Sequence, residues 1–354
     1  MELDDVQKRA LKWPLILSLV GAGFAVTVIL AGAWTRLMDA GLGCPDWPGC
    51  YGRLVVPPQG EALAHSPLIP LEPLKAWLEM IHRYMATGLG LLVLILVGFG
   101  LKLRRRAGYP WRLSLGILGL VILQGAFGAY TVTLKLWPQV VTLHLLGGLG
   151  VMLSLLWLHL RLRRVAFSTD EKKPPGAPRP AFWWWLAAFL LLIQIALGGW
   201  TSSNYAGVAC QGFPTCNGQW WPEQDWYEGF NLLQQIGPNY LYGQLHAPAR
   251  TAIHLAHRLG ALMLGLSLLL LALRYWSLRS LRPMLLALLA IYFLQLTLGI
   301  ANVLLALPLW LALMHTFGAI LLVSTFTLSY WRMRTLADPS SPTNQITNKE
   351  WAHA

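Results

Sequence analysis

Four histidines lie within or at the mouths of long apolar runs, and they form two pairs: His82 with His144, and His257 with His315. An ionisable side chain inside a membrane is costly, so each of these needs a partner or a function. Neutral imidazoles from two facing helices are one means of holding a haem iron. The alternative is that each histidine only hydrogen-bonds across helices. Because the pattern occurs twice, we favour two haem sites over zinc, which would need thiolates or carboxylates at zinc spacing.

Basic residues directly follow the first histidine of each pair. Arg83 follows His82 and Arg258 follows His257. A guanidinium group at this position could pair with the propionates of a porphyrin, because its planar fork suits a carboxylate. The alternative is that both arginines reach the lipid headgroups with their charged ends. We predict propionate binding for both.

Glu79 makes the two halves of the pattern unequal. It precedes His82 by three residues, so a helix places both side chains on one face. A carboxylate there could accept a proton or stabilise a cationic intermediate, or it could form a salt bridge with Arg83 one turn away. The second half carries His254 in place of Glu79, and we interpret His254 as a hydrogen-bonding group. The asymmetry predicts a reaction site in the first half and an electron-transfer site in the second.

The elements that position these residues are predicted membrane helices. The chain of 354 residues is 56% hydrophobic and 12% charged, with a mean hydropathy of +0.51, which indicates a polytopic membrane protein. Eight apolar runs approach the about 20 residues that cross the hydrocarbon: residues 13–33, 77–101, 111–133, 139–161, 182–200, 250–273, 283–305 and 308–331. The first run is too long for a usual signal-peptide core, so we predict that it is retained.

The distribution of charge predicts the orientation of these spans. An even number of spans places both ends of the chain on one side of the membrane. Most of the 27 basic residues fall on that side, at the two ends and in the segments 102–112, 161–179 and 274–282. The positive-inside rule therefore predicts that both termini are cytoplasmic. The net charge of +12 is then an orientation signal, and no nucleic-acid partner is expected.

Two segments of the chain are repeated without gaps. Residues 32–52 match residues 198–218 at an offset of 166, and residues 124–144 match residues 295–315 at an offset of 171. We therefore predict an all-α membrane protein built from two pseudosymmetric, parallel four-helix bundles. The predicted organisation is an N-terminal half, a cytoplasmic linker, a C-terminal half and a cytoplasmic tail, at residues 1–161, 162–181, 182–331 and 332–354.

All of the cysteines fall in two long loops, 34–76 and 200–249, that this topology places outside: Cys44, Cys50, Cys210 and Cys216. An oxidising compartment permits a disulfide within each pair. Each disulfide could staple its loop, or it could be a redox-active pair that relays electrons near a haem, and both interpretations stay open. The chain has no Cys-x-x-Cys-His motif, so covalent haem attachment is not expected.

One motif resembles a known family. The run from Gly32 to Gly52 reads Gly-x-Trp-Thr-Arg-Leu-x-x-x-Gly-Leu-x-Cys-Pro-Asp-Trp-Pro-x-Cys-x-Gly, which resembles the first outer loop of haem A synthases. The glutamate and the four histidines also look like those of that family, and the resemblance extends over about residues 13–331. It implies oxidation of a ring methyl group of haem O to a formyl group, which gives haem A for cytochrome oxidase. The outer-loop cysteines are a feature of some members only.

The resemblance also implies a role for each site residue. It makes Glu79 catalytic. It assigns the histidines to two haems, with His82 and His144 binding the substrate haem O, and His257 and His315 binding a haem B cofactor.

Two other functions fit the same histidines. A dihaem b-type electron carrier would retain two haem B groups per chain. A haem transporter would need ligands along a path across the bilayer, whereas these histidines lie at one predicted depth. The expected partners are haem O, haem A and membrane lipid, and the sequence leaves open a homo-oligomer and a contact with haem O synthase. Because no Arg/Ser-rich leader precedes the first span, we expect a bacterial inner membrane.

Overall fold

Long helices form the framework of the protein. The computed structural model describes residues 5–105, 108–167 and 182–336, and the long elements in this part of the chain are all helical. Eight helices are long and apolar enough to cross a membrane, which confirms the predicted spans. They are α1 (Asp5–Leu37), α3 (Pro73–Leu103), α4 (Trp111–Thr133), α5 (Pro138–Phe167), α6 (Phe182–Ser203), α8 (Ala247–Tyr275), α9 (Arg282–Leu304) and α10 (Leu309–Leu336).

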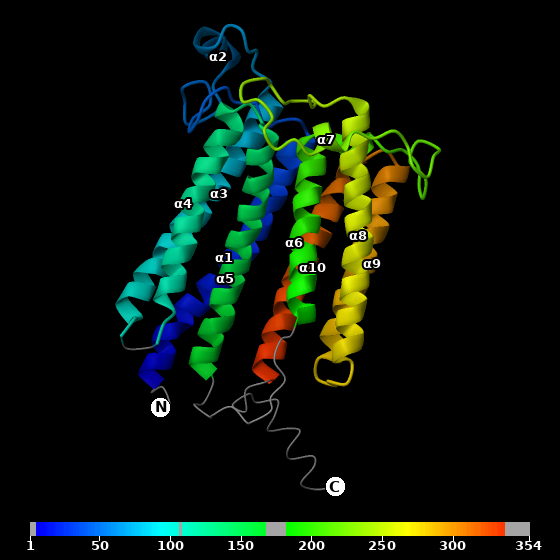
Figure 1. Cartoon of the computed structure of the whole chain (residues 1–354). Coiled ribbons are helices and arrows are strands. Elements are labelled where there is room, and N and C mark those ends of the chain that lie inside the picture. Colours follow the sequence, from blue (N-terminus) through cyan, green and yellow to red (C-terminus); the bar gives the residue numbers. More distant parts are fainter. Residues whose placement is uncertain (1–4, 106–107, 168–181, 337–354) are drawn as a thin grey trace.

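Three short elements that the sequence did not predict lie in the long loops: α2 (Gln59–His65), the 3-10 turn η1 (Ala206–Val208) and α7 (Trp226–Gly229). Both loops lie at one end of the bundle, and the start of α1 and the end of α10 lie at the other (Figure 1).

Several helices extend beyond the predicted spans. Helix α5 continues to Phe167 and α10 to Leu336, so the predicted linker 162–181 and tail 332–354 both begin as helix. The rest of these two segments, 168–181 and 337–354, lies outside the described residues. Hydropathy marks only the part of a helix that suits hydrocarbon, whereas the backbone hydrogen bonds of the helix continue into the polar interface.

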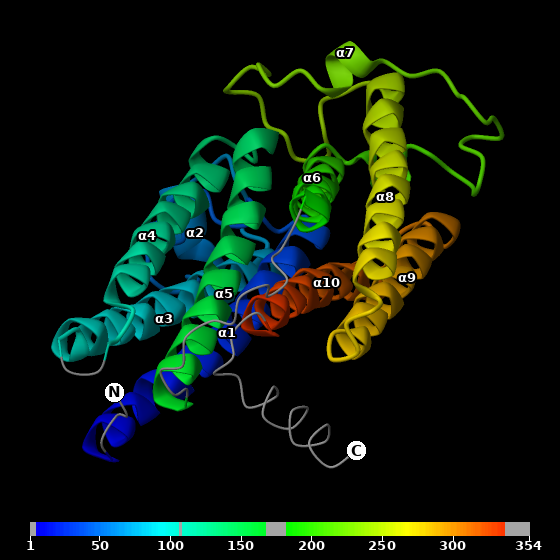
Figure 2. The ribbon, with the colours of Figure 1, turned by 60° about the horizontal axis from the view of Figure 1, so that its bottom comes forward.

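The helices pack in two groups. Helices α1, α3, α4 and α5 contact one another, as do α6, α8, α9 and α10, and the groups meet where α5 contacts α6 and α1 contacts α10 (Figures 1 and 2). One cluster of buried apolar side chains extends through both groups and includes Leu155, Leu158, Trp184 and Leu268. Packing of this kind is the main source of helix association in a membrane. It also fixes the position of one group against the other.

Small and hydroxylated residues bring α5 and α6 close together near the end of the bundle that carries the long loops. A Cβ atom on Gly199 would lie 3.2 Å from side-chain atoms of both Thr142 and Leu145, so a larger residue would require these neighbours to shift slightly. The hydroxyl groups of Thr142 and Ser203 are 3.3 Å apart and share a hydrogen bond. Close backbone contact through small residues is typical of membrane helix interfaces.

Two equivalent turns lead into the helices that carry the second histidine of each pair. The turn from α4 to α5 and the turn from α9 to α10 each pass through two left-handed residues, Lys135 (φ 49°) with Leu136 (φ 61°), and Ala306 (φ 56°) with Leu307 (φ 59°). Residues other than glycine adopt this conformation rarely. The shared backbone path places His144 and His315 at similar distances from their turns.

Candidate functional site

The structure brings together the histidines that the sequence analysis paired. His82 on α3 faces His144 on α5, with ring centres 6.5 Å apart and ring planes at 88°. His257 on α8 faces His315 on α10, also at 6.5 Å, with ring planes at 76°. The same geometry therefore occurs once in each group of helices.

This geometry fits one iron between each pair of rings. A metal–imidazole bond is about 2 Å long and the ligand nitrogen lies roughly 1.2 Å from the ring centre, so two flanking rings have centres about 6 to 6.5 Å apart. Among the described residues, Nδ1 of His144 and Nδ1 of His315 are buried without a hydrogen-bond partner. Buried polar atoms of this kind are costly unless a ligand or partner compensates. The residues present therefore fit a haem in each group.

A glycine of the preceding long helix lies against each of the four imidazole rings. The distance from a Cβ atom built on the glycine to Cε1 of the ring is 2.8 Å for Gly32 and His82, 3.5 Å for Gly128 and His144, 3.3 Å for Gly198 and His257, and 3.2 Å for Gly299 and His315. A larger residue at Gly32 would force the ring of His82 to move. The backbone of the neighbouring helix therefore limits how far each imidazole ring can move toward that helix.

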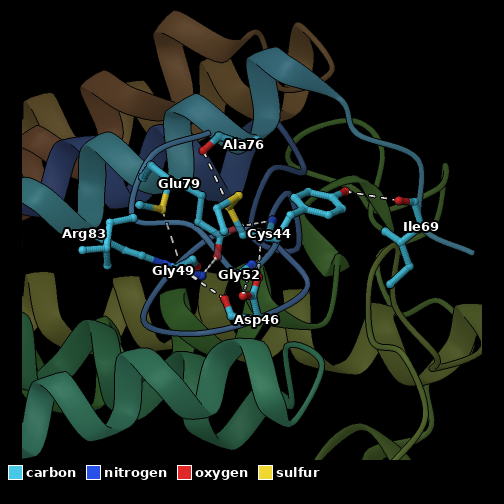
Figure 3. Close-up of a disulfide and its surroundings, with 12 residues drawn as sticks. Cys44, Asp46, Gly49, Gly52, Ile69, Ala76, Glu79 and Arg83 are labelled. Atoms are coloured by element: carbon cyan, nitrogen blue, oxygen red, sulfur yellow. Dashed lines mark hydrogen bonds and ion pairs between the residues drawn. A yellow bond between two sulfur atoms is a disulfide. The ribbon is translucent and has the colours of Figure 1, made fainter. Parts of the chain in front are cut away.

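Glu79 is buried and fixed by two partners. The residue is only 5% exposed, Oε2 accepts a hydrogen bond from the backbone N–H of Cys44 at 2.9 Å, and Oε1 pairs with the Arg83 guanidinium (Figure 3). The salt bridge to Arg83, which the sequence analysis gave as an alternative to a catalytic role, is thus present. A buried carboxylate needs such compensation for the loss of water. The contacts tie Glu79, three residues before His82 on α3, to the first cysteine loop.

The two arginines bind the loops that contain the cysteines. Arg83 donates to the carbonyl oxygens of Asp46 at 3.1 Å, Pro48 at 3.2 Å and Gly49 (Figure 3). Arg258 donates to the carbonyl oxygens of Thr215 at 3.1 Å, Cys210 at 2.9 Å and Gly212 at 2.9 Å. Each guanidinium group therefore gathers three carbonyl groups of one cysteine loop above the histidine that precedes it. The propionate contact stays a prediction.

Both predicted disulfides form, Cys44–Cys50 and Cys210–Cys216, each with a sequence separation of 6. A backbone bridge closes each loop at the same point, between Cys50 and Arg53 in the first and between Cys216 and Gln219 in the second. The disulfides therefore staple the loops that the arginines bind, and nothing in this geometry decides for or against an additional redox role.

Further contacts order the first cysteine loop. The Asp46 carboxylate accepts from the backbone N–H of Tyr51 at 2.6 Å and of Gly52 at 2.7 Å. The Tyr51 hydroxyl lies 3.3 Å from the carbonyl oxygens of Ile69 and Pro70 (Figure 3). Burial, followed by the nearby Asp46 charge, raises the pKa of the Tyr51 phenol, so it remains a donor. The loop that binds Glu79 is therefore internally fixed.

His254 is the counterpart of Glu79 in the second group, and its environment differs. It is buried, with 5% exposure, and Nδ1 is hydrogen-bonded to the Ala206 carbonyl oxygen at 2.9 Å. Its interpretation as a hydrogen-bonding group is confirmed. The second group therefore has no carboxylate at the position of Glu79.

The sequence analysis missed a set of glutamines beside the histidines. Gln194 on α6 contacts His257, and Gln295 on α9 contacts His315. Both are polar residues inside apolar runs, which was a signal for a functional position. Gln295 also begins the second repeated segment, opposite Gln124.

Comparisons with known proteins give a consistent result. The model of the COX15-CtaA family, described as cytochrome oxidase assembly protein, matches residues 15–327. A protein of Shewanella oneidensis named heme A synthase is 45% identical over 342 residues, which cover 95% of this chain and 99% of the relative. Another of that name, from Erythrobacter litoralis, is 30% identical over 339 residues, which cover 86% of this chain and 93% of the relative.

Proposed function

The chain belongs to the COX15-CtaA family of cytochrome oxidase assembly proteins, and we propose that it oxidises a ring methyl group of haem O to a formyl group, giving haem A. The observation that carries this function is the presence of two equivalent pairs of facing histidine rings, each pair with ring centres 6.5 Å apart. An enzyme that acts on one haem with the help of another needs two such pairs of histidines, one for each haem. The protein is a multi-pass membrane protein, so a substrate with a long isoprenoid tail can enter its site from lipid.

We further propose that the two halves have different roles. His82 and His144 bind the substrate haem O, and His257 and His315 bind a resident haem B. The position of Glu79 supports this division, because the first half has a buried carboxylate where the second has His254. When bound, the resident haem supplies an iron that takes up and passes on one electron at a time.

Glu79 would act on the substrate side. A carboxylate stabilises positive charge that develops at the methyl carbon and can accept the proton that leaves it. The Cys44 N–H and the Arg83 guanidinium fix the two oxygen atoms of this carboxylate, so it needs little reorganisation during the reaction. The first cysteine loop therefore serves the site by holding Glu79.

The membrane orientation is part of the proposal. We place the chain in a bacterial cytoplasmic membrane, with the two groups of helices as parallel repeats and both ends of the chain in the cytoplasm. The basic residues near the starts of α1 and α4 and the ends of α5 and α10 support this orientation, since such residues favour the cytoplasmic side. Both histidine pairs and both cysteine loops would then lie toward the outer face.

Identification of the bound haems tests the function directly. The full-length protein is purified in detergent, and its haems are extracted and separated. We expect one haem B per chain with a smaller amount of haem O or haem A. His257→Ala should lose the haem B, whereas His82→Ala should keep haem B and lose haem O and haem A. His246→Ala, on the outer loop away from both pairs, is the control.

The competing function makes a different prediction. A dihaem b-type electron carrier would contain two haem B groups per chain, and neither histidine variant would change the amount of haem A in the cell. That result would contradict the proposed reaction.

A further inference from the structure

Three of the four ligand histidines share a feature in the helical turn that follows them. A glycine stands three residues after the histidine, and a glutamine of the preceding helix lies over it. The distance from a Cβ atom built on the glycine to the nearest amide atom would be 1.8 Å for Gly147 and Gln124, 2.3 Å for Gly260 and Gln194, and 2.1 Å for Gly318 and Gln295. Glycine is therefore required for the glutamine to occupy this place.

In the C-terminal half the glutamines hydrogen-bond to the ligand residues themselves. Gln194 Nε2 donates to the His257 carbonyl oxygen at 3.1 Å and lies 3.2 Å from His257 Nδ1. Gln295 Nε2 donates to the His315 carbonyl oxygen at 2.8 Å. Both bonds are partly buried within apolar helices, where a hydrogen bond is stronger than in water and its loss more costly. Each amide thus ties one ligand-bearing turn to the neighbouring helix.

His82 is the exception. Met85 stands three residues after it, where the other ligand turns have glycine. On α1, the residue that lies 166 positions before Gln194 is Val28, which has no side-chain amide to offer, so only its backbone interacts with the His82 ring. The turn that carries His82 therefore has neither the glycine nor the glutamine of the other three.

We propose that the glutamine–glycine pair locks a haem ligand in place, and that its absence at His82 makes this histidine the exchangeable ligand. Groups that orient a metal-ligating histidine commonly change metal affinity by about 10- to 100-fold. Locks on both ligands of the C-terminal half suit a haem that stays, and an unlocked His82 suits a haem that arrives as substrate and leaves as product. The inference rests on the proposed function, since it explains how one haem is retained and the other released.

An exchange of residues between the halves tests the proposal. The variant Val28→Gln/Met85→Gly builds the lock at His82, and Gln194→Val/Gly260→Met removes it at His257. Each full-length protein is mixed with excess apomyoglobin, and haem transfer is followed by absorbance. We expect haem to leave the C-terminal half of Gln194→Val/Gly260→Met about ten-fold faster than in wild type. Haem O or haem A should leave Val28→Gln/Met85→Gly about ten-fold more slowly than it leaves wild type.

A single substitution that preserves side-chain size tests the lock in a protein that should still fold. Gln194→Leu keeps the bulk over Gly260 but removes the amide, so it should release haem B faster while its helix packing is retained. Its low-spin electron paramagnetic resonance signal should also change, because the His257 turn is no longer tied. The matched control is Gln139→Leu, since the Gln139 amide donates an exposed hydrogen bond to the Leu232 carbonyl oxygen at 3.2 Å, outside the turns that follow the histidines.

The outcomes separate the lock from the proposed function. Wild-type release rates in Gln194→Leu, or in either exchanged variant, would overturn the lock. Two haem B groups per chain would contradict the proposed reaction, yet faster release from Gln194→Leu would still support the lock in the C-terminal half.

Discussion

The Tyr205 hydroxyl donates a hydrogen bond to Oδ1 of Asp39 at 2.8 Å, and the two residues are 166 positions apart, which is the offset of the repeat. Arg36 lies over the Tyr205 ring, 4.0 Å from its centre, and donates to the carbonyl oxygen of Ser202 at 2.6 Å, again 166 positions away. Equivalent residues of the two repeated segments thus contact each other where the groups of helices meet.

Tyr205→Phe should weaken this junction. The substitution keeps the ring under Arg36 but removes the donor to Asp39, and a hydrogen bond to a charged group contributes about 1.5 to 3 kcal/mol. We expect the thermal midpoint in detergent to fall accordingly. Tyr227→Phe is the control, because that side chain is 86% exposed. Equal effects of the two substitutions would mean that the contact contributes nothing.

The same contact should persist to alkaline pH. Burial raises the pKa of the Tyr205 phenol above its usual range, so the hydroxyl keeps its proton and goes on donating. A raised pKa contributes stability that is complete below the unfolded value of about 10 and is lost as the pH rises through the folded value. The stability difference between wild type and Tyr205→Phe should therefore be constant at neutral pH and shrink only above about pH 10.

Glu79→Gln should slow the oxidation of haem O. The amide can still accept from the Cys44 N–H, but it carries no charge for Arg83 or for a developing cation. Loss of such a group commonly costs 10²- to 10⁴-fold in rate, so we expect about that loss, with haem O or its alcohol accumulating and haem B unchanged. Haem extraction from cells and chromatography measure this. Glu61→Gln, which changes an exposed carboxylate paired with Arg53, is the control. Unchanged haem A would remove Glu79 from the mechanism.

Alanine at Gly32 and at Gly128 should have unequal effects. The new Cβ atom would lie 2.8 Å from the His82 ring in the first case and 3.5 Å from the His144 ring in the second. Overpacking costs about 1 to 3 kcal/mol, so Gly32→Ala should lower the haem O and haem A content of the purified protein while Gly128→Ala leaves it near wild type. Gly125→Ala, with open space around the new atom, controls for the change in helix propensity. Equal losses from Gly32→Ala and Gly125→Ala would contradict the close contact.

Arg258→Lys should loosen the second cysteine loop. A lysine cannot reproduce the planar set of donors that reaches three carbonyl groups, so we expect a loss of about 1.5 to 3 kcal/mol in stability and faster proteolysis of residues 210–218. Arg53→Lys is the control, because its side chain is 65% exposed. The comparison is made with and without haem in the growth medium. Loop binding predicts the same loss in both preparations, whereas a loss confined to the haem-loaded protein would favour propionate binding instead.

The sequence was sufficient for the spans and the histidine pairs because both depend on local patterns. Hydropathy marks the helices, the His-Arg pairs at 82–83 and 257–258 match His82 with His257, and a repeated segment aligns His144 with His315. The features that the sequence did not reveal depend on contacts between residues that are far apart in the chain. The partners of Arg83 and Arg258 are carbonyl groups of a folded loop, which every residue has, so no side-chain pattern reveals them. The role of Gln194 depends on the space above Gly260, which exists only when two helices pack.

Asp39 and Tyr205 show what covalent joining of the halves permits. Two identical half-length chains around a two-fold axis would make this contact as a symmetric dimer, in which each position meets its own copy. Asp39 would then face a second aspartate, and the like charges would repel. Within one polypeptide each copy can diverge, so one supplies an acceptor and the other a donor. For the same reason, equivalent positions of the two halves can carry different residues, with Glu79 in the first half and His254 in the second.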